Sequence, residues 1–198
     1  MKKAVGPKES RDVAMGIARG SITIVRNDAG LLPLSPGFDG LVLVISPKVA
    51  SLTQVEELTG AASTLGKAVR SGAPQVVELL YPIRAKPFAS SYIISQARRA
   101  DLIIVGTYRA TAYPPQAKLV QALLELGKPM IVVALREPYD LREFPTVSTY
   151  VATYGTTPFS LEALGDILFA RVKPTGKLPV TIPGLAPGAP VLPGDHAA

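Results

Sequence analysis

Four short runs of apolar residues constrain the fold of this chain more than any other feature. They lie at residues 41–45, 76–80, 102–105 and 130–135, and only the second contains a charged residue, Glu78. A strand with one face in water alternates apolar and polar residues, whereas a continuous apolar run fits a strand that is buried on both faces. Because helices cover both faces of a parallel sheet, these runs predict a parallel sheet.

Helical patterns separate the apolar runs. Apolar residues recur at three- and four-residue spacings in 61–70, 89–99, 116–126 and 161–168, and 10–18 has a similar pattern. Weaker strand signals lie at 21–26 and 151–154. The alternation predicts an α/β fold, a three-layer α/β/α sandwich with a mostly parallel sheet of about five or six strands. Gly165 lies inside the last helical pattern, where glycine costs roughly 1 kcal/mol relative to alanine, so we expect close packing there.

The composition excludes several kinds of chemistry. The chain has 198 residues, of which 47% are hydrophobic, enough for one domain with its own core. It contains no cysteine, which excludes disulfides, thiolate nucleophiles and thiolate metal sites. The single histidine, His196, lies near the C-terminus and argues against a Ser-His-Asp triad or a histidine-rich metal centre. We therefore expect no metal and no cofactor.

Charge and hydropathy limit the partners. The net charge is +6, but the basic residues are scattered singly or in pairs, which predicts a solvated surface and no nucleic-acid binding. No segment approaches the roughly 20 apolar residues that span a bilayer, so no membrane partner is expected. Residues 1–7 are not followed by the apolar part of a signal peptide, so the sequence as it stands predicts a cytoplasmic chain. Glycine-rich phosphate-binding motifs are absent.

Candidate site residues follow two of the predicted strands. Ligands of open parallel sheets bind beyond the carboxyl ends of the strands. There we single out a group of aromatic, basic and acidic residues as candidates for contact with a polar ligand or an adjoining domain: Tyr108, Arg109, Tyr113, Arg136, Glu137, Tyr139 and Asp140. The alternative for this group is an ordinary solvated loop, since surface tyrosine and arginine are common in loops.

Two of these candidates, Glu137 and Asp140, are carboxylates. A pair of carboxylates is the machinery of acid–base catalysis and of glycoside hydrolysis. Asp140 and Glu143, however, have the three-residue spacing of a helix capping box, which favours a capping or solvated role for Asp140. No partner of either carboxylate is set by sequence spacing, so the signal for a catalytic pair is weak.

Four blocks of sequence carry a resemblance to a known family. They are residues 21–34, 100–106, 127–141 and 163–183, the last of which passes from a helical pattern through Pro-Thr-Gly into Leu-Pro-Val-Thr-Ile. In this order they resemble the C-terminal domain of family 3 glycoside hydrolases, over roughly residues 10–185. Pro-Tyr-Asp at 138–140 and Tyr-Gly at 154–155 look like the β-N-acetylglucosaminidase branch of that family.

The resemblance implies a domain without catalytic residues. In this family the nucleophilic aspartate belongs to an N-terminal (β/α)8 barrel, which this chain does not contain. In β-glucosidase relatives a glutamate of the C-terminal domain is the acid/base, but the corresponding stretch here, residues 107–116, has no carboxylate. In the glucosaminidase branch the acid/base is an Asp-His pair on the barrel.

The expected organisation follows from the resemblance. Residues 1–20 would be a linker helix from a missing barrel, 21–183 the α/β domain, and 184–198 an irregular tail rich in proline and glycine. The expected role is to pack on and support the barrel, and a surface left exposed without it could cause self-association. Two alternatives stay open: a free-standing module that binds an N-acetylglucosamine-containing glycan or another small ligand, and a subunit that completes a glycosidase in trans.

Overall fold

One six-stranded sheet forms the centre of the domain. The structure is a computed structural model that describes residues 8–48, 64–83 and 87–182. The strands are β1 (Thr23–Asn27), β2 (Val42–Lys48), β3 (Val76–Pro82), β4 (Leu102–Thr107), β5 (Met130–Ala134) and β6 (Thr149–Ala152). His196 and the predicted tail at 184–198 lie outside the described residues, as do residues 1–7 and 61–63 of the predicted helical segments.

The strand order confirms a mostly parallel sheet. The strands lie in the order β1-β6-β5-β4-β2-β3. Neighbouring strands are parallel except at one end, where β1 pairs with β6 antiparallel. The connection from β3 to β4 crosses back past β2, so the winding of the sheet reverses between β2 and β4. Such reversal points leave room for ligands or partners at the carboxyl ends of the strands.

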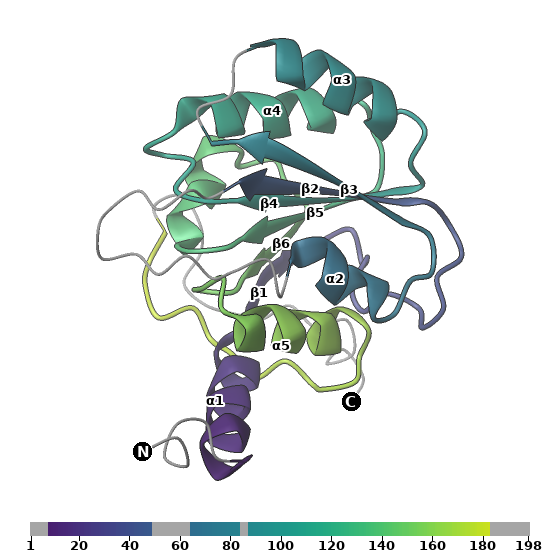
Figure 1. Ribbon diagram of the computed structural model, residues 1–198. Coiled ribbons are helices and arrows are strands. Elements are labelled where there is room, and N and C mark those ends of the chain that lie inside the picture. The colour runs from purple at the N-terminus through teal and green to yellow at the C-terminus, as the bar shows by residue number, and fades with distance from the viewer. Residues whose placement is uncertain (1–7, 49–63, 84–86, 183–198) are drawn as a thin grey trace, which may run out of the picture.

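Helices cover both faces of the sheet, as the three-layer prediction requires. In Figure 1, α3 (Pro87–Ala97) and α4 (Pro114–Leu124) lie above the sheet, while α2 (Leu65–Arg70) and α5 (Pro158–Leu168) lie below it. Helix α1 (Lys8–Ser21) extends beneath α5, and a 3₁₀ helix, η1 (Pro138–Glu143), follows β5. Within the described ranges, no helix has both the length and the apolar character needed to cross a membrane.

The two faces of the sheet belong to two separate cores, which explains the continuous apolar runs. In β2, Val42 and Val44 point into the core shared with α2 and α5. Leu43 and Ile45, which alternate with them, point into the core shared with α3 and α4. All four side chains are at most 2% exposed. Strands β4 and β5 alternate in the same way, so polar residues have no face to occupy.

A buried carboxylate fastens α1 to the domain. Asp166 of α5 accepts hydrogen bonds from the Arg19 guanidinium of α1 at 2.7 and 2.9 Å and from Arg171 Nε at 2.9 Å. Burial pushes the pKa of Asp166 upward, but the hydrogen bonds and charges of the two arginines outweigh it and hold the pKa below its usual value. Arg171 also donates to the Ser71 hydroxyl at 2.6 Å, so one carboxylate joins α1, α5 and the end of α2.

The close packing expected at Gly165 is present. A Cβ added to Gly165 would lie 2.8 Å from the backbone oxygen of Ala68 and 3.0 Å from Ser71 Oγ, both in or next to α2. The first of these contacts is shorter than real Cβ atoms show, and a backbone oxygen cannot rotate away. Helices α2 and α5 approach one another because glycine lies at their crossing.

We predict opposite effects for two glycine-to-alanine substitutions in helices. Gly165→Ala should lower the free energy of unfolding by about 1–3 kcal/mol, because the added methyl group forces α2 and α5 apart. Gly16→Ala in α1 is the matched control, since nothing lies within 4 Å of its added Cβ. There the variant should be more stable by up to about 1 kcal/mol, from helix propensity alone. Urea unfolding followed by circular dichroism measures both, and equal effects would contradict the packing explanation.

Candidate functional site

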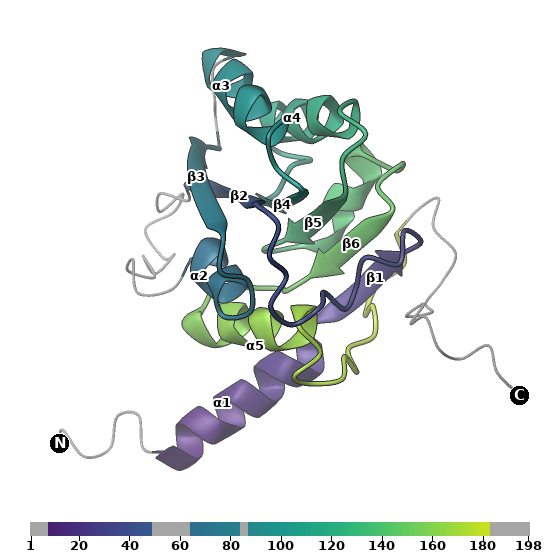
Figure 2. The ribbon, with the colours of Figure 1, turned by 90° about the vertical axis from the view of Figure 1, so that its right-hand side faces the viewer.

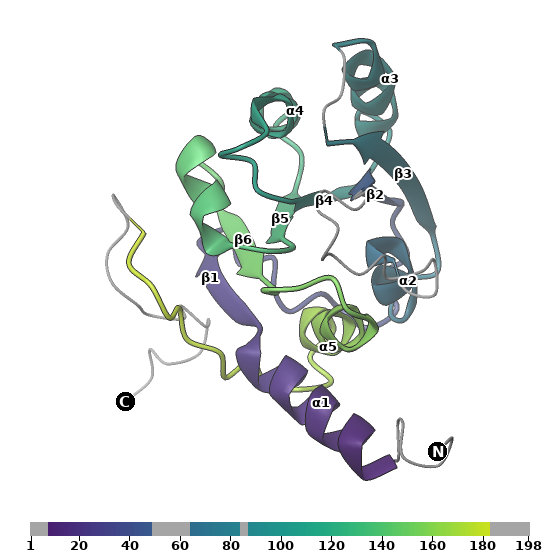
Figure 3. The ribbon, with the colours of Figure 1, turned by 60° about the vertical axis from the view of Figure 1, so that its left-hand side comes forward.

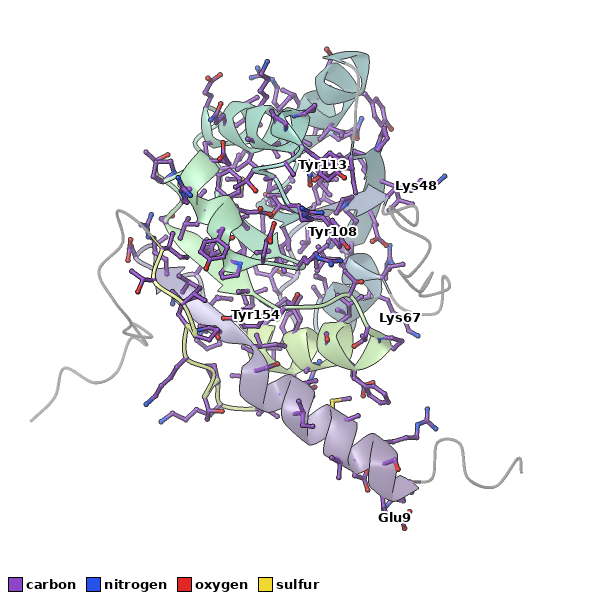
Figure 4. The ribbon with its side chains drawn as sticks, turned by 90° about the vertical axis from the view of Figure 1, so that its left-hand side faces the viewer. Glu9, Lys48, Lys67, Tyr108, Tyr113 and Tyr154 are labelled. Carbon is purple, nitrogen blue, oxygen red and sulfur yellow. The ribbon has the colours of Figure 1, made fainter. Side chains whose placement is uncertain are left out.

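The candidate residues lie in two neighbouring loops at the carboxyl edge of the sheet. We call them the rim loops: residues 108–113, which follow β4, and residues 135–140, which follow β5. Because β4 and β5 are adjacent parallel strands, with Thr107 opposite Ala134, the two loops leave the sheet side by side. Figure 4 looks onto this edge, with Tyr108 and Tyr113 near its centre. The structure thus brings together residues that are far apart in the sequence.

Tyr108 and Arg136 connect the two rim loops. The Arg136 guanidinium lies over the Tyr108 ring, 5.4 Å from its centroid, and donates a hydrogen bond to the Tyr108 hydroxyl. The tyrosine is buried and the arginine is exposed. A guanidinium stacked on an aromatic ring keeps outward donors while losing little freedom on binding. This pair therefore offers a fixed positive charge at the rim.

A buried amide holds the backbone of the first rim loop. Gln116 of α4 is fully buried, and its Oε1 accepts from the Tyr108 N–H at 2.9 Å while its Nε2 donates to the Tyr108 carbonyl at 2.8 Å. The Tyr81 hydroxyl lies 3.0 Å from the same Oε1. Our sequence reasoning missed Gln116. A usable signal was its position on the apolar stripe 116, 119, 120 and 123, where a polar side chain needs a buried partner.

A second pair joins the loops nearer to solvent. Arg109 Nε lies 3.5 Å from Glu137 Oε1, with the two side chains 41% and 34% exposed. Arg109 also has a left-handed backbone with φ of 54°, as does Tyr154 after β6 with φ of 56°. Non-glycine residues in this conformation cost free energy and are concentrated at functional sites. Two of the three such residues in the described chain thus lie at this edge of the sheet.

Asp140 supports the first rim loop from below and does not cap a helix. It is fully buried inside η1, where its Oδ1 accepts from the Ala110 N–H at 2.7 Å. The capping-box interpretation was wrong, because η1 begins earlier, at Pro138, and its N-cap residue is Glu137. Burial raises the pKa of Asp140 to about 6 and the charge of Glu137 adds to this, although the Ala110 hydrogen bond opposes it.

The two remaining candidates, Tyr113 and Tyr139, lie outside the pairs that connect the rim loops. Tyr113 is half-buried directly before α4, where its N–H donates to the Arg109 carbonyl at 3.0 Å. Tyr139 is half-buried in η1 and takes part in neither of the pairs described above. The structure therefore assembles Tyr108, Arg136, Arg109 and Glu137 at the surface of the rim, with Asp140 beneath them.

This arrangement suits binding better than catalysis. Hydrolysis by two carboxylates needs both of them in contact with the substrate. Glu137 reaches the surface of the rim loops, but Asp140 is fully buried. Within the described part of the chain, no group of three or more histidine, cysteine, aspartate or glutamate side chains is placed to hold a metal ion. The guanidinium groups of Arg109 and Arg136 reach the surface of the rim, and such groups bind polar or acidic surfaces.

The buried carboxyl of Asp140 predicts an unusual pH dependence of stability. Its pKa rises from 3.8 to about 6 on folding, so the folded state binds the proton more tightly and loses stability as the pH rises from about 4 to 6. The shift corresponds to at most about 3 kcal/mol. Asp140→Asn cannot ionise, so its stability relative to wild type should be greater at pH 8 than at pH 4.

Chemical unfolding at a series of pH values measures this difference. Glu162→Gln is the control, because it removes one carboxylate from the exposed side of α5 without touching the rim. Parallel stability curves for wild type and Asp140→Asn between pH 4 and pH 8 would contradict the placement of Asp140.

Comparison with known proteins identifies relatives that are much longer than this chain. A protein of Formosa agariphila with the provisional name beta-xylosidase is 26% identical over 92% of the chain, which spans 27% of that protein. A solved fungal GH3 β-N-acetylglucosaminidase with an N-acetyltransferase region is 25% identical, with a TM-score of 0.79, over 94% of this chain and 21% of its own. A GH3 β-N-acetylglucosaminidase from Paenibacillus sp. str. FPU-7 is 27% identical, with a TM-score of 0.76, over 87% and 32%.

The family follows from a match to most of the domain. The family described as "Glycosyl hydrolase family 3 C-terminal domain" matches residues 22–194. The match contains every strand of the sheet and helices α2 to α5, so it covers the same body as the structure. The chain therefore belongs to glycosyl hydrolase family 3, of which it contains the C-terminal domain.

Proposed function

We propose that this chain is the non-catalytic C-terminal domain of a β-N-acetylglucosaminidase-type family 3 enzyme. Its role is to pack on a catalytic (β/α)8 barrel through the rim loops and to support it. The chain spans 21–32% of the relatives described above, which leaves room in them for a catalytic part. The two solved relatives described above, at 25% and 27% identity, are both GH3 β-N-acetylglucosaminidases, which supports this branch.

The accessibility of the carboxylates is the observation that carries the proposal. Of the two rim carboxylates, only Glu137 reaches the surface, and it already pairs with Arg109. Asp140 Oδ1 accepts a hydrogen bond from the buried Ala110 N–H at 2.7 Å. Moving the Asp140 side chain to the surface would leave that donor without this acceptor. A two-carboxylate mechanism therefore has one usable group here, whereas it needs two.

The construction of the rim fits a docking surface. Gln116 and Asp140 hold the first rim loop by backbone hydrogen bonds, so the loop is ordered before it meets a partner. Preorganised loops lose little conformational entropy on binding, which raises affinity. Arg136 and Arg109 provide charge that would orient the rim on an acidic or carbonyl-rich surface.

A carbohydrate-binding module is the second candidate, and the Tyr108–Arg136 pair favours it. Aromatic rings and guanidinium groups are common in sugar sites, and this pair lies at the sheet edge where ligands of such folds bind. The ring of Tyr108, however, is buried, which leaves little aromatic surface for a sugar to stack on. Calorimetry with chitobiose separates the two functions: saturable heat that is lost in Arg109→Ala would favour the module.

We predict that the purified chain does not hydrolyse an aryl N-acetylglucosaminide. The physical reason is the single accessible carboxylate of the rim, so Glu137→Gln should leave the background rate unchanged. The rate of hydrolysis is measured from the absorbance of the released aryl group. Clear turnover in the wild type that disappears in Glu137→Gln would overturn the non-catalytic assignment.

We also predict that a catalytic barrel covers the rim when the two are joined. The chain has no cysteine, so Ala112→Cys places a unique thiol on an exposed residue of the first rim loop. The chain is fused behind a cysteine-free form of the Paenibacillus enzyme without its own C-terminal domain. The thiol should react more slowly with a maleimide in the fusion than in the free chain, because the barrel shields it. Equal rates would count against docking through the rim.

A further inference from the structure

Helix α1 has two apolar faces, and only one of them is packed. With 3.6 residues per turn, Met15, Ala18 and Arg19 lie on the side that faces α5. Residues 13, 16, 17 and 20 lie on the opposite side, at spacings of three and four. Val13 is 62% exposed and Ile17 is 68% exposed, two of five large hydrophobic side chains that are exposed in the described chain.

The two glycines make this outer face open to close approach. A Cβ added at Gly16 or Gly20 would meet nothing within 4 Å. Neither glycine is required by a positive φ, since both lie within the helix, where glycine costs roughly 1 kcal/mol relative to alanine. Glycines between two exposed aliphatic side chains form a surface onto which another backbone can pack closely. A helix that faced only water would gain from alanine at both positions.

The outer face is held in a fixed position. Arg19 ties α1 to Asp166, and the Ser21 hydroxyl donates to the Ala18 carbonyl at 3.0 Å at the end of the helix. The segment after α5 then passes so close to the end of α1 that a Cβ on Gly176 would lie 2.2 Å from the Ile22 carbonyl oxygen. Figure 2 shows α1 extending away from the body from this fixed end. Residues 13, 16, 17 and 20 are therefore presented by an anchored helix.

We propose that the outer face of α1, formed by Val13, Gly16, Ile17 and Gly20, is a docking surface for the N-terminal catalytic part of a longer family 3 polypeptide. This inference rests on the proposed function and adds a second contact to the rim. The family match begins at residue 22, so α1 directly precedes the C-terminal domain. In the solved relatives at least two thirds of the chain lies outside the region that this chain covers.

The size of the face argues for a covalently linked partner. Fourteen helical residues span about 21 Å, and one side of such a helix buries far less than the roughly 1,200 Å² of a standard stable interface. A second copy of the chain would have too little area here for a stable dimer. A domain on the same polypeptide has an effective concentration in the millimolar range, at which a small apolar contact is sufficient.

Thiol labelling in the fusion with the Paenibacillus catalytic part tests this surface. Ile17→Cys, and Val13→Cys in a separate variant, place a unique thiol on the outer face, and the loss of either exposed side chain should leave the free chain folded. Each thiol should react with a maleimide about tenfold more slowly in the fusion than in the free chain, as expected for a face covered about 90% of the time. Tyr92→Cys, on the exposed side of α3, is the control and should react equally fast in both.

The pattern of protection separates this inference from the proposed function. Protection of Ile17→Cys and Val13→Cys in the fusion supports the α1 surface. Protection of Ala112→Cys with no protection of the α1 thiols would leave the rim contact intact and overturn the α1 surface. No protection at any of the three positions would overturn both. If the free chain sediments as a dimer and Ile17→Cys is already protected in it, the partner of this face is a second copy of the chain. That result would also overturn the inference.

Discussion

Burial of both faces of the central strands determines where every polar group of this domain can lie. Strands β2, β4 and β5 contribute apolar side chains to two cores, one against α2 and α5 and one against α3 and α4. A sheet of this kind leaves its polar chemistry to the loops at the ends of the strands. At the carboxyl edge this chemistry lies in the rim loops, where Gln116 of α4 and Asp140 of η1 hold the first rim loop.

Two aspartates show how the same side chain is used in opposite ways. Burial and the like charge of Glu137 outweigh the hydrogen bonds to Asp140, so its proton is held more tightly in the folded state. Asp166 is flanked by two guanidinium groups that overcome the effect of burial, so its charged form is favoured. Raising the pH ionises the buried Asp140 at a cost in folding stability, while Asp166 beside its two arginines keeps its charge. The two attachments therefore respond differently to pH.

Sequence reasoning succeeded where the signal is local and failed where partners are distant. Continuous apolar runs predicted the parallel strands, and a glycine within a helical pattern predicted close packing at Gly165, because each signal lies in one segment. The partner of Gly165, helix α2, was not predicted. The three-residue spacing of Asp140 and Glu143 is the same whether the Asp140 side chain faces solvent or is buried against another loop. The bond of Asp140 to Ala110, 30 residues away in the sequence, could therefore not be predicted. The Arg19–Asp166 pair joins residues that are 147 positions apart, and no local sequence pattern indicates it. The rule that ligands bind beyond the carboxyl ends of parallel strands located the rim but not its internal support.

Helix α5 sets the distance between the rim and the outer face of α1. It begins at the carboxyl edge, where the Thr157 hydroxyl accepts from the Ser160 N–H at 3.1 Å, and it carries Asp166 near its other end. Its close crossing with α2 at Gly165 prevents it from sliding. In Figure 4, α1 extends from beneath the edge on which Tyr108 and Tyr154 lie. A single rigid partner that contacts both surfaces would therefore meet them at a separation that one helix fixes, and the Asp166 hydrogen bonds to Arg19 maintain that separation.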